Sequence, residues 1–139
     1  MSRQSVFLLV EDNEDDVFFM RRAFKDAQLP NELHVVNSGE AALEYLSNSG
    51  PFSDREKYPM PDLVFLDLKM PGLDGFDVLA WMRQERGLDV PVAVLTSSPE
   101  DSDRQRATIL GADCYLLKPP TRAMLRSCCE QFKLKCGIS

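Results

Sequence analysis

Apolar residues fall in five short blocks along the chain, separated by longer segments of mixed polarity. The blocks are Val6–Val10, Leu33–Asn37, Leu63–Asp67, Val92–Thr96 and Cys114–Leu117. Several of them lack the alternation of apolar and polar residues that marks a strand with one face in water. Continuous apolar runs of this length are typical of parallel strands covered on both faces. We therefore expect five buried parallel strands.

Apolar residues recur at helical spacing in the segments that follow each strand. The first segment opens with Glu14, Asp15 and Asp16, which are better explained as a helix start, where the dipole favours acids, than as extra metal ligands. The fourth segment is weakly apolar, runs from about residue 100 to 110 and ends at Gly111. The other stripes consist of Val17, Met20, Phe24, Ala27, Ala41, Ala42, Leu43, Leu46, Val78, Leu79, Met82, Met124, Cys128 and Phe132. Five strand–helix units in succession predict one α/β domain with right-handed crossovers and helices on both faces of the sheet.

Composition argues against nucleic-acid and membrane partners and for a location in the cytoplasm. The chain has 139 residues, enough for one domain with a real core, and its net charge of −6 argues against a nucleic-acid partner. The apolar run that begins at Val6 is too short for a signal sequence or a membrane span, so we expect no membrane association. The four cysteines (Cys114, Cys128, Cys129 and Cys136) have neither metal-site spacing nor a secreted pattern, which predicts reduced thiols in the cytoplasm.

Three smaller features have ordinary structural interpretations. Cys128 and Cys129 point about 100° apart on a helix, so we expect at most one of them in the core. The stretch from Asn48 to Pro61 contains three prolines and predicts a long surface loop. Trp81 lies off its helical stripe, which predicts partial exposure and edge packing, and His34 is a lone strand histidine with a structural or exposed position.

Side chains that could bind a ligand or react with it stand at the ends of the predicted strands. Glu11 and Asp12 follow the first strand, Asp67 ends the third, Thr96 ends the fourth, and Lys118 follows the fifth. In an open parallel sheet, ligands bind outside the carboxyl ends of the strands. We therefore expect three carboxylates, a hydroxyl and an ammonium to meet at one edge of the sheet.

This combination of groups predicts a metal-assisted phosphoryl transfer. Three neighbouring acids raise one another's pKa values unless a cation is present, and oxygen ligands with room for water suit Mg²⁺. In phosphoryl transfer the protein positions the groups and neutralises the charge on the phosphoryl oxygens. Because carboxylates can form acyl phosphates, Asp67 is the predicted attacking group.

The sequence resembles the receiver domains of two-component response regulators. The resemblance rests on Glu11-Asp12 after "VFLLV", Asp67 in "LDLKMPGLDG", Thr96 in "VLTSS" and Lys118 in "CYLLKPP". It implies a flavodoxin-like, doubly wound sheet of five parallel strands in the order 2-1-3-4-5 with five helices.

The resemblance covers nearly the whole chain and points to one branch of the family. It spans about residues 6–133, the core of a single receiver domain over residues 1–139. The long loop at residues 48–61 is similar to that of the small stand-alone regulators that partner bacterial phytochrome-type histidine kinases. Two differences from many members of the family are Glu11 in place of an aspartate and a second proline, Pro120.

The resemblance also assigns the chemistry of the site. Asp67 is expected to accept a phosphoryl group from a phosphohistidine on a sensor histidine kinase or a histidine phosphotransfer protein. Asp12 and Asp67 are expected to ligate Mg²⁺ directly, Glu11 to act through a water molecule, and the Lys69 main-chain carbonyl to complete the protein ligands.

A switch is implied by the same resemblance. Thr96 and Lys118 are expected to hold the phosphoryl oxygens, Tyr115 to be the aromatic switch residue, and the Lys118–Pro119 peptide bond to be cis. The expected protein is a stand-alone phosphoacceptor with self-catalysed phosphorylation and slow autodephosphorylation rather than an enzyme. Its switched surface, formed by the fourth helix, fifth strand and fifth helix, would bind a partner or a second copy of the chain.

Two other functions remain open on the sequence. An aspartate-nucleophile phosphatase also uses a strand-end aspartate with Mg²⁺, but it typically has a second acid two residues later, and Lys69 stands there. A degenerate receiver could act as a constitutive interaction module, although all the expected chemical groups are present.

Overall fold

The computed structural model describes residues 5–29 and 32–134, so Cys136 lies outside the described residues. Its five strands form one parallel sheet in the order β2-β1-β3-β4-β5, which confirms the predicted topology. Each predicted strand is present, with its ends within one residue of the prediction. The strands are β1 (Phe7–Val10), β2 (Leu33–Val36), β3 (Leu63–Leu66), β4 (Val92–Thr96) and β5 (Cys114–Leu117).

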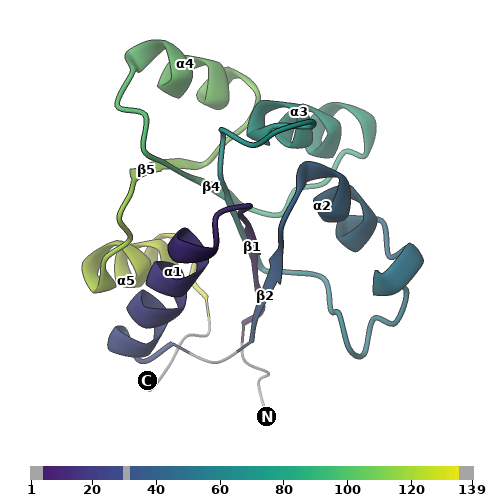
Figure 1. Ribbon diagram of the computed structural model, residues 1–139, viewed down its shortest axis with the longest axis horizontal. Helices are drawn as coiled ribbons and strands as arrows, with labels where there is room; N and C mark the ends of the chain where they lie inside the picture. Colours follow the sequence, from purple (N-terminus) through teal and green to yellow (C-terminus); the bar gives the residue numbers. More distant parts are fainter. Residues whose placement is uncertain (1–4, 30–31, 135–139) are drawn as a thin grey trace.

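Helices cover both faces of this sheet, as Figure 1 shows. α1 and α5 pack together on one face, and α2, α3 and α4 lie in sequence along the other. α3 continues into a π-helical turn, η2 (Trp81–Glu85), and a short 3-10 helix, η1 (Gly50–Phe52), follows α2. The helices are α1 (Glu14–Asp26), α2 (Gly39–Leu46), α3 (Gly75–Ala80), α4 (Asp101–Ile109) and α5 (Arg122–Gln131). No helix in the described part of the chain is long and apolar enough to cross a membrane.

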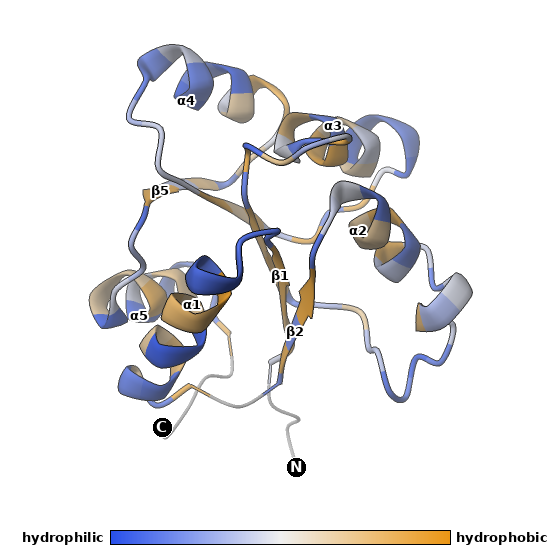
Figure 2. Ribbon diagram, in the orientation of Figure 1, coloured by the Kyte–Doolittle hydropathy of each residue, from blue (hydrophilic) through white to orange (hydrophobic). Residues whose placement is uncertain are grey.

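The strands divide their side chains between two apolar cores, one under each helical layer. In β1, Phe7 and Leu9 face α1 and α5, whereas Leu8 and Val10 face the other helices. This alternation explains why the strand sequences are apolar at every position. Figure 2 shows the result as apolar colour along the central strands and on the inner sides of the helices.

The strand register places two acids at the same level of the sheet. Val10 is paired with Leu66, so Glu11 and Asp67 are the next residues beyond paired strand ends. The Asp67 amide donates to the Val10 carbonyl at 3.1 Å, which fixes the backbone of the acid against β1. The two carboxylates are therefore held by the central strands and not by a free loop.

The first turns of α1 and α3 stand close to these strand ends. Asn13 caps α1, because its side-chain oxygen accepts the amides of Asp15 and Asp16 at 2.9 and 3.1 Å. The predicted acidic first turn of α1 is confirmed. α3 begins at Gly75, where a Cβ atom would lie 2.3 Å from the Asp67 carbonyl oxygen. Only glycine allows this helix to begin so near the end of β3.

Two expectations about burial were wrong. Cys128 and Cys129 are both in the core, with exposed fractions of 2% and 8%. The buried face of α5 consists of Leu125, Cys128 and Cys129, and such a face is wider than 100°, so two adjacent small residues fit within it. The fifth strand is not covered on both faces, because β5 is an edge strand with half-buried residues and Leu117 exposed.

The loop at residues 48–61 is anchored to the fold. The guanidinium of Arg55 donates to the main-chain carbonyls of Tyr45, Leu46 and Tyr58 at 3.0–3.2 Å. The Tyr45 hydroxyl donates to the Pro59 carbonyl at 2.8 Å. The loop therefore has a defined conformation over α2, away from the strand ends that carry the acids.

Candidate functional site

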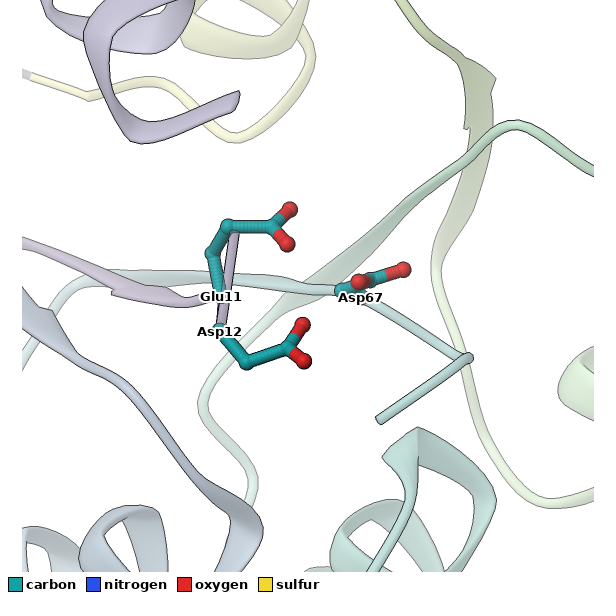
Figure 3. A group of neighbouring side chains, drawn as sticks. All are labelled: Glu11, Asp12 and Asp67. Carbon is teal, nitrogen blue, oxygen red and sulfur yellow. The ribbon is translucent and has the colours of Figure 1, made fainter. Parts of the chain in front are cut away.

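Three carboxylates meet at the carboxyl ends of β1 and β3. Figure 3 shows Glu11 and Asp12 extending from the end of β1 on the side where Asp67 leaves β3. One carboxylate oxygen from each residue lies within 4.8 Å of the other two. Glu11 and Asp67 are buried, with exposed fractions of 2% and 5%, and Asp12 is exposed. Of the three acids, Asp12 is therefore the one in contact with solvent.

The donor set fits a hard divalent cation. All three side chains offer oxygen atoms, and two of them are buried carboxylates, which are rare without a compensating positive charge. Burial raises the pKa of Glu11 to about 7; the hydrogen bond from Lys118 opposes this shift, and the charge of Asp67 adds to it. A cation held between the carboxylates would relieve the same repulsion, as Mg²⁺ does in oxygen-ligand sites.

Lys118 supplies the positive charge that faces these acids. Its ammonium lies 2.8 Å from the Glu11 carboxylate and 3.5 Å from the Asp67 carboxylate, and only 12% of its side chain is exposed. The Lys118–Pro119 bond is cis, as expected, and the Lys118 amide donates to the Thr96 carbonyl at 2.8 Å. The fifth strand therefore delivers its lysine to the acids at the centre of the sheet.

Electrostatics keep the lysine charged in spite of its burial. Burial alone would lower the pKa of Lys118, but hydrogen bonds to Asp16 and Glu11 and the charge of Asp67 outweigh it, so the pKa lies above its ordinary value. The ammonium is therefore available to neutralise a further negative group bound beside Asp67.

Thr96 and Tyr115 are connected through the loop that follows β4. The Thr96 side chain is fully buried, and its hydroxyl accepts the Ser98 amide at 3.2 Å. The Tyr115 hydroxyl donates to the Ser98 carbonyl at 2.9 Å. The ring of Tyr115 also lies under the guanidinium of Arg104, 5.0 Å from its centre. Ser98 thus links the end of β4 to the edge strand.

Both the main chain and the side chain of Lys69 contact acids. Its amide donates to the Asp67 carboxylate at 3.3 Å, and its ammonium pairs with Asp103 of α4 at 3.3 Å. The Ser98 hydroxyl donates to the same Asp103 carboxylate at 2.8 Å. The bond from Ser98 holds the pKa of Asp103 below its ordinary value; burial opposes this shift and Lys69 adds to it. This contact joins the loop after β3 to the start of α4.

The structure brings Glu11, Asp12, Asp67 and Lys118 together as the sequence predicts, while sequence reasoning missed Asp16 and Asp103. The Asp16 carboxylate lies 2.7 Å from the Lys118 ammonium. No local pattern marks Asp16 as a site residue, because Asp12 precedes the cap Asn13 and shares no helical turn with it. No local pattern marks Asp103 either, because its contacts come from two separate loops.

Comparisons with known proteins agree with this geometry. The family model described as "Response regulator receiver domain" matches residues 7–130. The response regulator Rcp1 of Synechocystis sp. is 35% identical over 134 residues, which cover 96% of this chain and 85% of Rcp1.

Solved structures of response regulators are also similar to this chain. The Mn(2+)-bound form of Rcp1 is 33% identical, covers 94% of this chain and 95% of its own, and has a TM-score of 0.76. The phosphorylated cyanobacterial phytochrome response regulator RcpA is 30% identical, with coverages of 94% and 92% and a TM-score of 0.77. The bacteriophytochrome response regulator RtBRR is 33% identical, with coverages of 99% and 82% and a TM-score of 0.83. The fold, the cluster of acids and these matches together establish that the chain belongs to the response regulator receiver domain family.

Proposed function

We propose that this protein is a two-component response regulator in which Asp67 accepts a phosphoryl group from a phosphohistidine. The observation that carries the proposal is the buried Asp67 carboxylate, which lies beside the carboxylates of Glu11 and Asp12 and 3.5 Å from the Lys118 ammonium. The phosphodonor is a sensor histidine kinase or a histidine phosphotransfer protein. The phosphorylated form of the similar regulator RcpA supports this assignment.

The transfer requires little covalent chemistry from the protein. A carboxylate oxygen of Asp67 attacks the phosphorus atom, an O–P bond forms and the P–N bond to the histidine breaks. The electron pair remains on the imidazole nitrogen, which takes up a proton. Lys118 neutralises one phosphoryl oxygen, and the Thr96 hydroxyl donates a hydrogen bond to another. The backbone of Asp67 is fixed by β1, so the nucleophile is already in position before the donor arrives.

The same site is proposed to bind Mg²⁺. Asp12 and Asp67 would hold the ion directly, Glu11 would act through a water molecule, and the Lys69 main-chain carbonyl would complete the protein ligands. When it is bound, Mg²⁺ neutralises charge on the carboxylates and on the phosphoryl oxygens. The all-oxygen donor set and the Mn(2+)-bound form of the similar Rcp1 support a divalent cation.

The response to phosphorylation follows from the Ser98 link. When the Thr96 hydroxyl turns to a phosphoryl oxygen, its hydrogen bond with the Ser98 amide is weakened, and the Ser98 carbonyl is the partner of the Tyr115 hydroxyl. A shift of this loop moves Tyr115 and the surface formed by α4, β5 and α5. Partner binding or homodimerisation through that surface is the proposed output, within one cytoplasmic receiver domain whose core spans about residues 6–133.

The assignment is tested by phosphorylation with a small donor. The protein is incubated with acetyl phosphate and Mg²⁺ and weighed intact by mass spectrometry. We expect a mass gain of one phosphoryl group that disappears in Asp67→Asn and when Mg²⁺ is chelated. Asp89→Asn, which removes an exposed carboxylate away from the site, is the matched control and should gain the group as the unmodified protein does. A mass gain that persists in Asp67→Asn contradicts the assignment.

A further inference from the structure

The acid nearest to the Lys118 ammonium is Asp16 of α1. The Nζ atom lies 2.7 Å from Asp16 Oδ2, 2.8 Å from Glu11 Oε1 and 3.5 Å from Asp67 Oδ2. An ammonium group has three protons to donate, and the first two distances are those of charge-assisted hydrogen bonds. The third is longer than a normal hydrogen bond. Asp16 of α1 and Glu11 therefore hold Lys118 more closely than the proposed phosphoacceptor Asp67 does.

Asp16 differs from its neighbours in the first turn of α1. Glu14 and Asp15 are exposed, whereas the Asp16 side chain is partly buried against Lys118. Its amide is fixed by the Asn13 cap at 3.1 Å. The helix start therefore aims the Asp16 carboxylate at the site, and the pair is shielded more than an ordinary surface ion pair, whose energy solvent and salt reduce.

We propose that Asp16 is a positioning residue that draws the Lys118 ammonium toward α1 and competes with the phosphoryl oxygens for it. The inference rests on the proposed function, because it concerns how firmly a phosphoryl group on Asp67 is held. Lys118 must give up part of its contact with Asp16 to neutralise a phosphoryl oxygen. The carboxylate of Asp16 also adds a negative charge beside a group that is itself anionic. Both effects weaken the hold on the phosphoryl group.

The test measures the affinity for beryllofluoride, which mimics a phosphoryl group on an aspartate, by isothermal titration calorimetry in saturating Mg²⁺. Asp16→Asn removes the charge and keeps the shape, so Lys118 is free to turn to the bound group. We expect the affinity to rise about fivefold, the size typical of one partly exposed ion pair. Asp16→Ser, which also suits a helix start, should show the same direction and provides a second variant should Asp16→Asn fail to fold.

Two matched variants separate positioning from general charge. Asp15→Asn makes the same charge change in the same helical turn, but its side chain is exposed, so the affinity should equal that of the unmodified protein. Asp16→Glu keeps a carboxylate that can reach Lys118, so its affinity for beryllofluoride should equal that of the unmodified protein. A purely structural role for Asp16 does not predict this rescue. Circular dichroism spectra verify that each variant is folded.

The outcomes distinguish the inference from the function on which it rests. Tighter binding by Asp16→Asn or Asp16→Ser, together with rescue by Asp16→Glu, supports the competition. Unchanged or weaker binding in folded Asp16 variants overturns it, as does an equal gain in Asp15→Asn. An unmodified protein that binds no beryllofluoride, or an Asp67→Asn variant that binds it equally well, overturns the proposed function and the inference with it.

Discussion

The centre of the sheet and its β5 edge differ in how firmly they are packed. Every residue of β1, β3 and β4 is buried, whereas β5 is half-buried and 37% of Leu117 is exposed. The helices repeat the contrast. α1, α2, α3 and α5 each bury three or four residues, but α4, which lies beside β5, buries only Ala107.

This difference in packing places the acids in a rigid part of the fold and the proposed switch residue in a less rigid part. Glu11 and Asp67 extend from buried central strands, so their positions are fixed by the core. Tyr115 belongs to the edge strand, and its hydroxyl contacts a loop carbonyl. Segments with few buried apolar contacts open or shift at lower cost than core strands do. The acids are therefore placed where the fold is stiff, and the proposed switch residue is placed where it can move.

The largest effect is expected from Phe65→Ala in β3. Phe65 is fully buried and packs against the rings of Phe7 and Phe24, with ring centres 6.2 and 6.1 Å away. We expect its truncation to lower the free energy of unfolding by about 3–5 kcal/mol, measured by urea denaturation. Leu117→Ala at the β5 edge should cost less than about 1 kcal/mol because Leu117 is partly solvated. Equal losses would remove the distinction between centre and edge.

A smaller effect is expected from Arg83→Met, which removes the hydrogen bonds between η2 and the residues just before β5. The Arg83 guanidinium donates to the carbonyls of Gly111 and Val90 and to the Asp113 carboxylate at 2.9–3.1 Å. Its loss should cost about 1–3 kcal/mol. Hydrogen exchange should quicken in β5 and remain unchanged in β1. The exposed Arg86→Met is the control, and a uniform increase over the whole sheet would contradict the local tie.

The smallest effect is expected from Tyr115→Phe, which removes only the hydroxyl that donates to the Ser98 carbonyl. One neutral hydrogen bond predicts a loss of about 1 kcal/mol in the free energy of unfolding. Faster amide exchange should be confined to the loop between β4 and α4. Tyr58→Phe removes the same atom over α2 and should leave that loop unchanged. Protection of the loop that is identical in Tyr115→Phe and the unmodified protein would mean that Tyr115 does not restrain it.

The sequence predicted the central strands and the convergence of the acids well because both follow from local rules. Continuous apolar runs such as Leu63–Leu66 require cover on both faces, and a parallel sheet places the residues after its strands at one edge. The partial exposure of β5 could not be predicted in this way. The four residues "CYLL" are apolar enough to predict a strand, but they do not show how closely the neighbouring helices cover it.

Asp16 was missed for a different physical reason. Its place in an acidic helix start already had a sufficient local explanation in the helix dipole. Its contact with Lys118 joins residues 102 positions apart, so no local pattern reports it. Cys129 shows the same limit, because the width of a buried helix face depends on the surfaces that pack against it.

The close approach of α3 to β3 at Gly75 has a consequence for how this scaffold can vary. A methyl group at position 75 would collide with the main chain of Asp67 and Leu68, since neither backbone can turn aside as a flexible side chain would. The loop at residues 48–61 lies over α2, away from the acids, whereas the junction at Gly75 lies against the main chain of the proposed phosphoacceptor. We therefore expect the junction at Gly75 to tolerate substitution less than the loop does.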